Sequence, residues 1–178
     1  MGDGYGTAGF LVIVALYLTI GVLAAAGCVA LGRRFFGPRV EQVFYGIFLV
    51  LIAGFYLAFA AYFGMATALR VESAVVVVFL VIGSLGARVP VALIIGYPMH
   101  ALWDLLHEFQ QQGSFSVFGP GQLTTVPLAY GLFCAAFDLY MAGYFASRRG
   151  DWNAAWLSGA SPSGTPEPDA PESGSPAS

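Results

Sequence analysis

The feature that most constrains this chain is a succession of long apolar stretches separated by short polar segments. A helix needs about 20 mainly apolar residues to cross the hydrocarbon core of a bilayer. The five stretches that approach or reach this length are 9–31, 40–63, 72–85, 87–109 and 126–147. Helices and closed barrels are the structures that satisfy their own backbone polar groups inside a membrane. The sequence therefore predicts an all-α integral membrane bundle of five transmembrane helices within residues 1–150.

The composition indicates a multi-pass membrane protein. The chain has 178 residues, of which 58% are hydrophobic and 10% charged, whereas a soluble domain carries about 25% charged residues. There is no lysine, and all seven basic residues are arginines. A nucleic-acid partner is not expected, because no basic patch is large enough to neutralise several phosphates. The partner that the sequence predicts is the lipid bilayer.

The arginines predict the orientation of the helices. If five helices cross the membrane, the segments after the first, third and fifth stretches lie on the same side. The arginines in these segments are Arg33, Arg34, Arg39, Arg88, Arg148 and Arg149. Only Arg70 falls on the opposite side. The positive-inside rule then places the N-terminus outside and the C-terminus in the cytoplasm. We also expect an ion pair between Arg88 and Glu41, since both lie on the cytoplasmic side.

Two segments leave alternatives open. The stretch 72–85 is short for a span, so it forms either a tight helical hairpin with the next stretch or a re-entrant segment. After Gly150 the composition changes to mostly Ser, Pro, Gly, Ala, Thr, Glu and Asp. Such a segment cannot bury enough apolar surface to become ordered. Residues 151–178 are therefore predicted to form a disordered acidic tail, with Trp152 and Trp156 at the lipid headgroups.

The two histidines of the chain lie close together in an apolar stretch. His100, Asp104 and His107 have the spacing i, i+4 and i+7, which places them on one face of a helix. Glu108 follows directly and occupies the end of the same predicted helix. Ionisable residues inside a membrane are costly to bury and mark functional sites by default. This polar face is the candidate site of the protein.

A further acidic residue lies on the neighbouring predicted helix. Asp138 shares its helix face with small residues at helical spacing, which are Gly131, Ala135, Ala142 and Ala146. Small residues let another membrane helix approach closely. Antiparallel helices joined by one loop usually pack together, so Asp138 is predicted to come within reach of His100. The two histidines, Asp104 and Asp138 are then predicted to converge in the outer half of the bundle.

These residues suggest a metal centre. Histidine and aspartate suit Zn, Fe or Mn, and Zn²⁺ in such a site would serve to activate water. The leading hypothesis is a metal-dependent membrane enzyme that acts on a lipid or another apolar small molecule. In this hypothesis His100, Asp104 and His107 hold the metal, Asp138 is a fourth ligand or a general base, and Glu108 is a proton shuttle.

Two other functional classes remain open. In a transporter or a proton or ion conduit, Asp138, His100 and His107 would form a relay, although the sequence shows no evident inverted repeat. In a non-catalytic structural or assembly subunit, the same residues would be a hydrogen-bonded clasp that fixes the register of the helices. The sequence does not define the substrate, the metal or the oligomeric state.

The segment HALWDLLH at residues 100–107, followed by Phe137, Asp138 and Tyr144, resembles a bacterial family of small multi-pass membrane proteins of unknown function. The resemblance covers roughly residues 9–147. It implies a bacterial cytoplasmic membrane and carries no activity with it. The pattern is also similar to membrane hydrolases of the ceramidase type, which combine histidines and aspartates on several helices. Those enzymes have more helices and more histidines, so their chemistry is not transferred.

Overall fold

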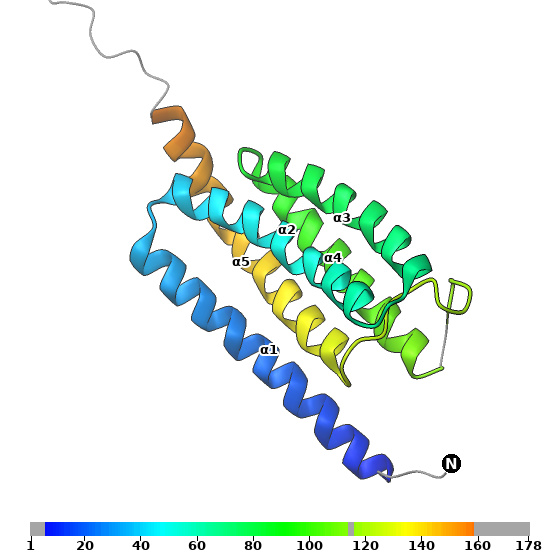
Figure 1. Ribbon diagram of the computed structural model, residues 1–178. Helices are drawn as coiled ribbons and strands as arrows, with labels where there is room; N and C mark the ends of the chain where they lie inside the picture. The colour runs from blue at the N-terminus through cyan, green and yellow to red at the C-terminus, as the bar shows by residue number, and fades with distance from the viewer. Residues whose placement is uncertain (1–5, 114–115, 159–178) are drawn as a thin grey trace, which may run out of the picture.

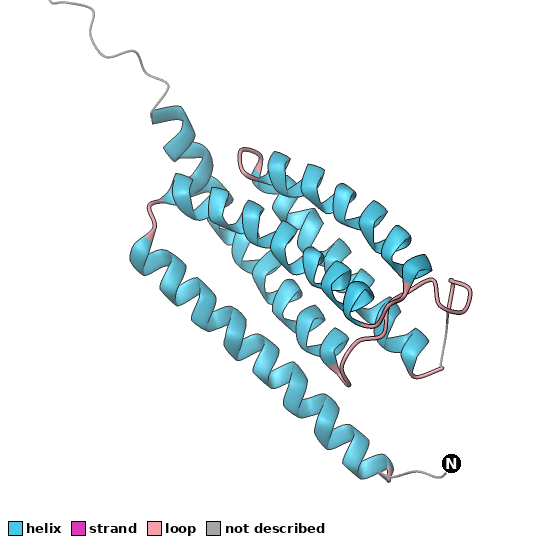
Figure 2. Ribbon diagram, in the orientation of Figure 1, coloured by secondary structure: helices cyan, strands magenta, loops and turns pink. Residues whose placement is uncertain are grey.

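The computed structural model describes residues 6–113 and 116–158. Over these residues the chain forms five α-helices and short connections (Figure 1 and Figure 2). The helices are α1 (Thr7–Phe35), α2 (Pro38–Tyr62), α3 (Ala66–Gly86), α4 (Pro90–Gln111) and α5 (Tyr130–Ser158). The all-helical prediction is confirmed, and each predicted stretch corresponds to one helix.

The helices end where local backbone chemistry favours a turn. α2 and α4 each begin with a proline, which lacks the N–H that would be unpaired in the first turn anyway. Gly64 has a φ of +67° in the connection from α2 to α3, a conformation that glycine adopts without steric cost. α3 begins at Ala66 and has 21 residues, whereas the sequence predicted a start at residue 72. The predicted boundary was too late by more than a turn, and the helix is long enough to cross a membrane.

Three of the helices, α1, α2 and α3, are long and apolar enough to cross a membrane. These helices indicate a membrane protein. α4 and α5 are not among them, and they are the helices that carry His100, Asp104, His107 and Asp138. The polar residues that define the candidate site also lower the hydropathy of the helices that present them. The count of five spans therefore stays a prediction.

The helices pack as an antiparallel bundle in which α4 and α5 lie side by side along their length (Figure 1). A Cβ added at Gly131 of α5 would overlap the backbone carbonyl of Asp104 on α4, so a glycine is what allows this approach. α1 lies along the outer edge of the bundle against α5, where Gly21 meets the backbone of Phe133. Most large side chains of α1 are exposed, as expected of a helix that faces lipid.

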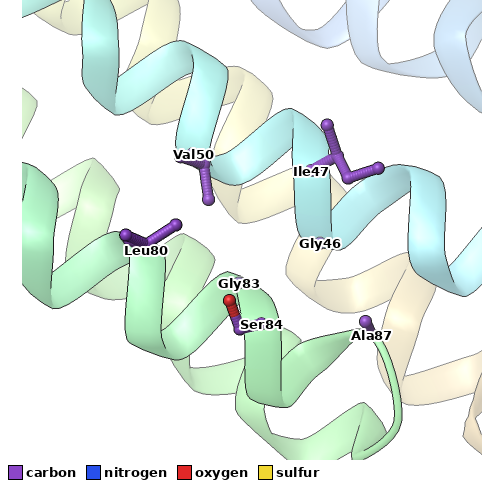
Figure 3. Close-up of a pocket in the computed structure, with 7 residues that line it drawn as sticks. All are labelled: Gly46, Ile47, Val50, Leu80, Gly83, Ser84 and Ala87. Atoms are coloured by element: carbon purple, nitrogen blue, oxygen red, sulfur yellow. The ribbon is translucent and has the colours of Figure 1, made fainter.

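α2 and α3 cross at a pair of glycines. Gly46 and Gly83 bring the two backbones into direct contact, because a Cβ at either position would overlap the carbonyl oxygen of the other. Beside this crossing is an apolar groove of about 320 Å³ (Figure 3). Ile47 and Val50 line it from α2, and Leu80 lines it from α3. The groove lies on the outer face of the bundle and contains no residue of the candidate site.

α5 extends further than the sequence predicted. It continues to Ser158, so the predicted end at residue 147 and the predicted tail boundary at 151 are both corrected. Residues 159–178 of that tail lie outside the described residues. The reason for the extension is Trp152, which is fully buried and donates a hydrogen bond from its indole Nε1 to Glu41 at 2.9 Å. Trp152 is thus packed against protein instead of facing the headgroups.

The end of the bundle that carries most arginines is held by polar contacts. Glu41, fully buried at the start of α2, pairs with Arg148 of α5 at 3.1 Å. The expected pair between Glu41 and Arg88 is therefore wrong: the Arg88 guanidinium lies 4.2 Å from the ring centroid of Trp156. The Trp156 indole in turn donates to Gln42. These contacts join the start of α2, the α3–α4 connection and the end of α5.

Candidate functional site

Three residues of the predicted site converge in the interior of the bundle. The Nδ1 atom of His100 lies 2.7 Å from Oδ2 of Asp138 and 3.1 Å from Oδ2 of Asp104. All three side chains are at most 1% exposed. His100 and Asp104 stand one helical turn apart on α4, and Asp138 reaches them from α5. The predicted contact between these two helices is confirmed.

The small residues of α5 explain how Asp138 comes so close. Gly131, Ala135 and Ala142 are buried on the same face as Asp138, as predicted. Ala146 is exposed and does not belong to this face. The absence of large side chains on three successive turns lets the backbones of α4 and α5 approach. A short aspartate can therefore reach an imidazole on the other helix.

Each of these three residues keeps one buried polar atom without a hydrogen bond. Within residues 6–113 and 116–158, the atoms are His100 Nε2, Asp104 Oδ2 and Asp138 Oδ1. Asp104 Oδ2 is near His100 Nδ1 but does not have hydrogen-bond geometry with it. Leaving a buried polar group unpaired costs about 1–3 kcal/mol. Each of the three buried side chains therefore has one polar atom that could bind a further group.

The same three residues fit a metal ligand set. One ligand atom from each of His100, Asp104 and Asp138 can be chosen so that all lie within 4.8 Å of one another. An imidazole nitrogen with carboxylate oxygens suits Zn²⁺ and the other divalent transition metals. Three protein ligands are the number found in catalytic zinc sites, which keep a further position for water or substrate. The donor set could therefore hold a metal ion.

His107 lies outside this group. Its Nε2 is 2.9 Å from Oε1 of Glu72, and its Nδ1 is 2.9 Å from the backbone oxygen of Trp103. Both ring nitrogens therefore face an oxygen atom within hydrogen-bond distance. Glu72 also accepts from the backbone N–H of Thr124 and from the Trp103 indole. The pair is closed, and His107 has no ring nitrogen left to bind a metal in this arrangement.

Tyr56 of α2 stands between the two groups. Its hydroxyl donates a hydrogen bond to Oδ1 of Asp104, and its ring stacks on His107 with 4.2 Å between the centroids. The sequence predicts no role in the site for Tyr56 or Glu72, because their contacts with Asp104 and His107 depend on how α2, α3 and α4 pack.

Glu108 has a different environment from the one predicted. Its Oε2 accepts from the backbone N–H of Gly131 at 3.2 Å, and its Oε1 accepts from the amide of Gln112 at 2.6 Å. The carboxylate therefore lies at the N-terminus of α5, where a negative charge is favoured by the helix dipole. This contact explains an acidic residue at the end of α4. It anchors α5 and lies apart from the three-residue group.

The loop before α5 covers the Glu72–His107 end of the bundle. Leu123, Thr124 and Val126 are each less than 5% exposed, and the side chain of Gln111 makes two hydrogen bonds to the backbone of Val126. A pocket of about 160 Å³ lies here and reaches His107. Residues 123–126 therefore cover the part of the bundle where His107 lies.

A second, apolar pocket of about 250 Å³ lies between α3 and α4. Phe79 and Trp103 form part of its wall. The Phe79 ring also contacts His100, with 5.1 Å between the centroids, and Trp103 contacts His107 at the same separation. Two aromatic side chains thus separate an apolar pocket from the two histidines.

Comparisons of the chain with protein-family models, curated proteins and solved structures found no match.

Proposed function

We propose that this protein is a membrane-embedded, metal-dependent enzyme that acts on a lipid or another apolar small molecule. The observation that supports this proposal is the buried group of His100, Asp104 and Asp138, in which each residue keeps one unpaired polar atom. A purely structural clasp would be expected to satisfy these atoms, as the Glu72–His107 pair does.

The charge of the group also favours a cation. When both carboxylates are ionised, the group of two carboxylates and one imidazole has a net negative charge, whether or not His100 is protonated. Buried charges are costly unless they are paired or coordinate a metal. The cations on the described part of the chain are arginines, and their ion pairs involve Glu41 and Asp151, away from His100. A divalent metal ion would neutralise the carboxylates.

In this function His100 and Asp104 hold the metal from α4 and Asp138 holds it from α5. A bound divalent ion supplies Lewis-acid chemistry. Asp138, which forms the shorter contact with His100, also orients the imidazole. The apolar pocket between α3 and α4 supports an apolar substrate, because its wall residue Phe79 touches His100.

The family and the location are part of the same proposal. We infer from the HALWDLLH segment that the chain belongs to a family of small multi-pass proteins of the bacterial cytoplasmic membrane. All five helices would cross the bilayer, with the C-terminus in the cytoplasm. The distribution of arginines supports this orientation.

Metal analysis of the full chain purified in detergent tests the proposal. We expect close to one Zn, Fe or Mn per chain, lost in His100→Ala and retained in Tyr97→Phe, which removes only a buried hydroxyl bonded to the Tyr45 backbone. Purified protein without metal, and with a melting temperature that a chelator leaves unchanged, would overturn the metal centre. If every single variant fails to fold, a structural clasp is the better explanation.

Turnover needs a separate measurement. Metal-loaded protein in vesicles of bacterial lipid extract is expected to generate new lipid species by mass spectrometry, and Asp138→Asn is expected to abolish them. A metal-bound protein that leaves all lipids unchanged would contradict the lipid substrate.

A proton or ion conduit is the second candidate, and a row of buried polar side chains inside the bundle favours it. The row consists of Glu72, His107, Tyr56, Asp104, His100 and Asp138. In proteoliposomes, a conduit would collapse an imposed pH gradient, and a folded Asp138→Asn variant would not. If the metal-free protein collapses the pH gradient, the conduit is the better proposal and the metal-dependent enzyme is overturned.

A further inference from the structure

Tyr56 is a buried polar residue that contacts the three-residue group from a third helix. It lies on α2, is 1% exposed, and places its hydroxyl against Oδ1 of Asp104. The other oxygen of that carboxylate, Oδ2, faces His100 at 3.1 Å and makes no hydrogen bond. The two oxygens of Asp104 thus have different tasks: Oδ1 accepts from Tyr56, and Oδ2 lies within the three-residue group.

The contact of Oδ1 with Tyr56 and the contact of Oδ2 with His100 together fix the orientation of the Asp104 carboxylate. Rotation of Asp104 about its terminal bond would move Oδ2 away from His100, and it would break the hydrogen bond to Tyr56. Hydrogen bonds of this kind to a metal-binding side chain commonly set both its orientation and the affinity of the site.

Tyr56 is itself held on both sides. Its ring stacks on His107, with 29° between the planes, and His107 is fixed by Glu72 and by the Trp103 carbonyl. On another side, the Tyr130 ring of α5 meets Tyr56 edge-on, with centroids 6.3 Å apart. The Glu72–His107 pair therefore has a function without binding a metal, since it supports the residue that orients Asp104.

We propose that Tyr56 is the positioning residue of the metal centre: it directs Oδ2 of Asp104 towards His100, and the closed Glu72–His107 pair keeps it in place. The inference rests on the proposed metal centre and assigns an additional residue to it. Tyr56 acts through Asp104 and is not itself a ligand.

The chain offers a matched control for a test. Tyr97 of α4 is also fully buried, and its hydroxyl also donates one hydrogen bond, to the backbone oxygen of Tyr45 at 3.0 Å. Tyr56→Phe and Tyr97→Phe remove the same atom from equally buried rings, so their general effects on stability are comparable. Only the first substitution removes a hydrogen bond to Asp104.

The experiment measures Zn²⁺ affinity by chelator competition, and the visible absorption spectrum of Co²⁺, for the full chain in detergent. Tyr56→Phe is expected to bind Zn²⁺ about 10–100-fold more weakly than the wild type and to change the Co²⁺ spectrum. Tyr97→Phe is expected to leave both unchanged. The melting temperatures of the two metal-free variants should be similar.

The possible failures are distinguishable. A wild type that binds neither ion overturns the metal centre, and this inference with it. Wild type, Tyr56→Phe and Tyr97→Phe with equal affinities and equal spectra would overturn the role of Tyr56 alone. Equal weakening in both variants would show a general effect of packing, and would also contradict the role.

Discussion

The two histidines of this chain lie seven positions apart on one helix face and have opposite environments. His107 uses both ring nitrogens, one with Glu72 and one with a backbone oxygen. His100 uses Nδ1 and leaves Nε2 buried without a partner in the described part of the chain. The two histidines on one helix face therefore differ: His107 has both ring nitrogens in contact with acceptors, and His100 has one nitrogen free to bind a ligand. The difference arises because each histidine packs against different helices.

The buried pair of Glu72 and His107 gives a prediction about stability. Removing one partner of a buried pair leaves the other charge unpaired, at a cost of about 3–5 kcal/mol. We expect Glu72→Ala and His107→Ala each to lower the free energy of unfolding by such an amount, measured by denaturation in detergent micelles. The double variant should lose clearly less than the sum of the two. Strict additivity of the two losses would contradict the pair.

At the scale of the helices, α5 owes its position to Gly131. A Cβ there would overlap the Asp104 carbonyl and approach Glu108. Gly131→Ala is therefore expected to push α5 away from α4, to destabilise the protein by about 1–3 kcal/mol, and to weaken metal binding because Asp138 moves with the helix. Thermal melting and a Zn²⁺ titration measure the two effects.

Gly143 provides the control for this substitution. It lies on the same helix, and a Cβ there would meet nothing within 4 Å. Alanine has the higher helix propensity, so Gly143→Ala should be neutral or slightly stabilising. Equal behaviour of the two alanine variants would contradict the close α4–α5 contact.

The sequence predicts helices well where apolar periodicity alone determines them. It predicted His100, Asp104, His107 and Asp138 in one group, because helix spacing and a small-residue face are local patterns. The structure brings three of them together and pairs His107 with Glu72 instead. The predicted start of α3 was too late because the charged residues Arg70 and Glu72 interrupt the apolar pattern there. Glu72 is tolerated inside the bundle because His107, 35 residues away, pairs with it.

The end of α5 shows the same limit. The polar run after Ser147 ends the apolar pattern, yet the helix continues to Ser158. Trp152 is bonded to Glu41, which is 111 residues away in the chain. Partners this distant follow from the packing of α2 against α5, which no local pattern encodes. The role of Tyr56 was missed for the same reason.

At the scale of the whole molecule, the predicted orientation can be checked by chemical labelling. Val117 lies in the loop before α5 and Gly150 lies near its other end, and both are exposed. In a background without Cys28 and Cys134, we expect Val117→Cys to react with an impermeant maleimide in intact bacterial cells. Gly150→Cys should react only after permeabilisation. The reverse pattern would contradict an outside N-terminus and a cytoplasmic C-terminus.

X-ray absorption spectroscopy of the zinc-loaded full chain tests the central claim most directly. With only two histidines in the chain, the number of imidazoles around the metal identifies the ligands. The ligand set of His100, Asp104 and Asp138 predicts one imidazole with the remaining donors oxygen. Two imidazoles, a sulfur donor, or protein that binds no zinc at all would contradict it.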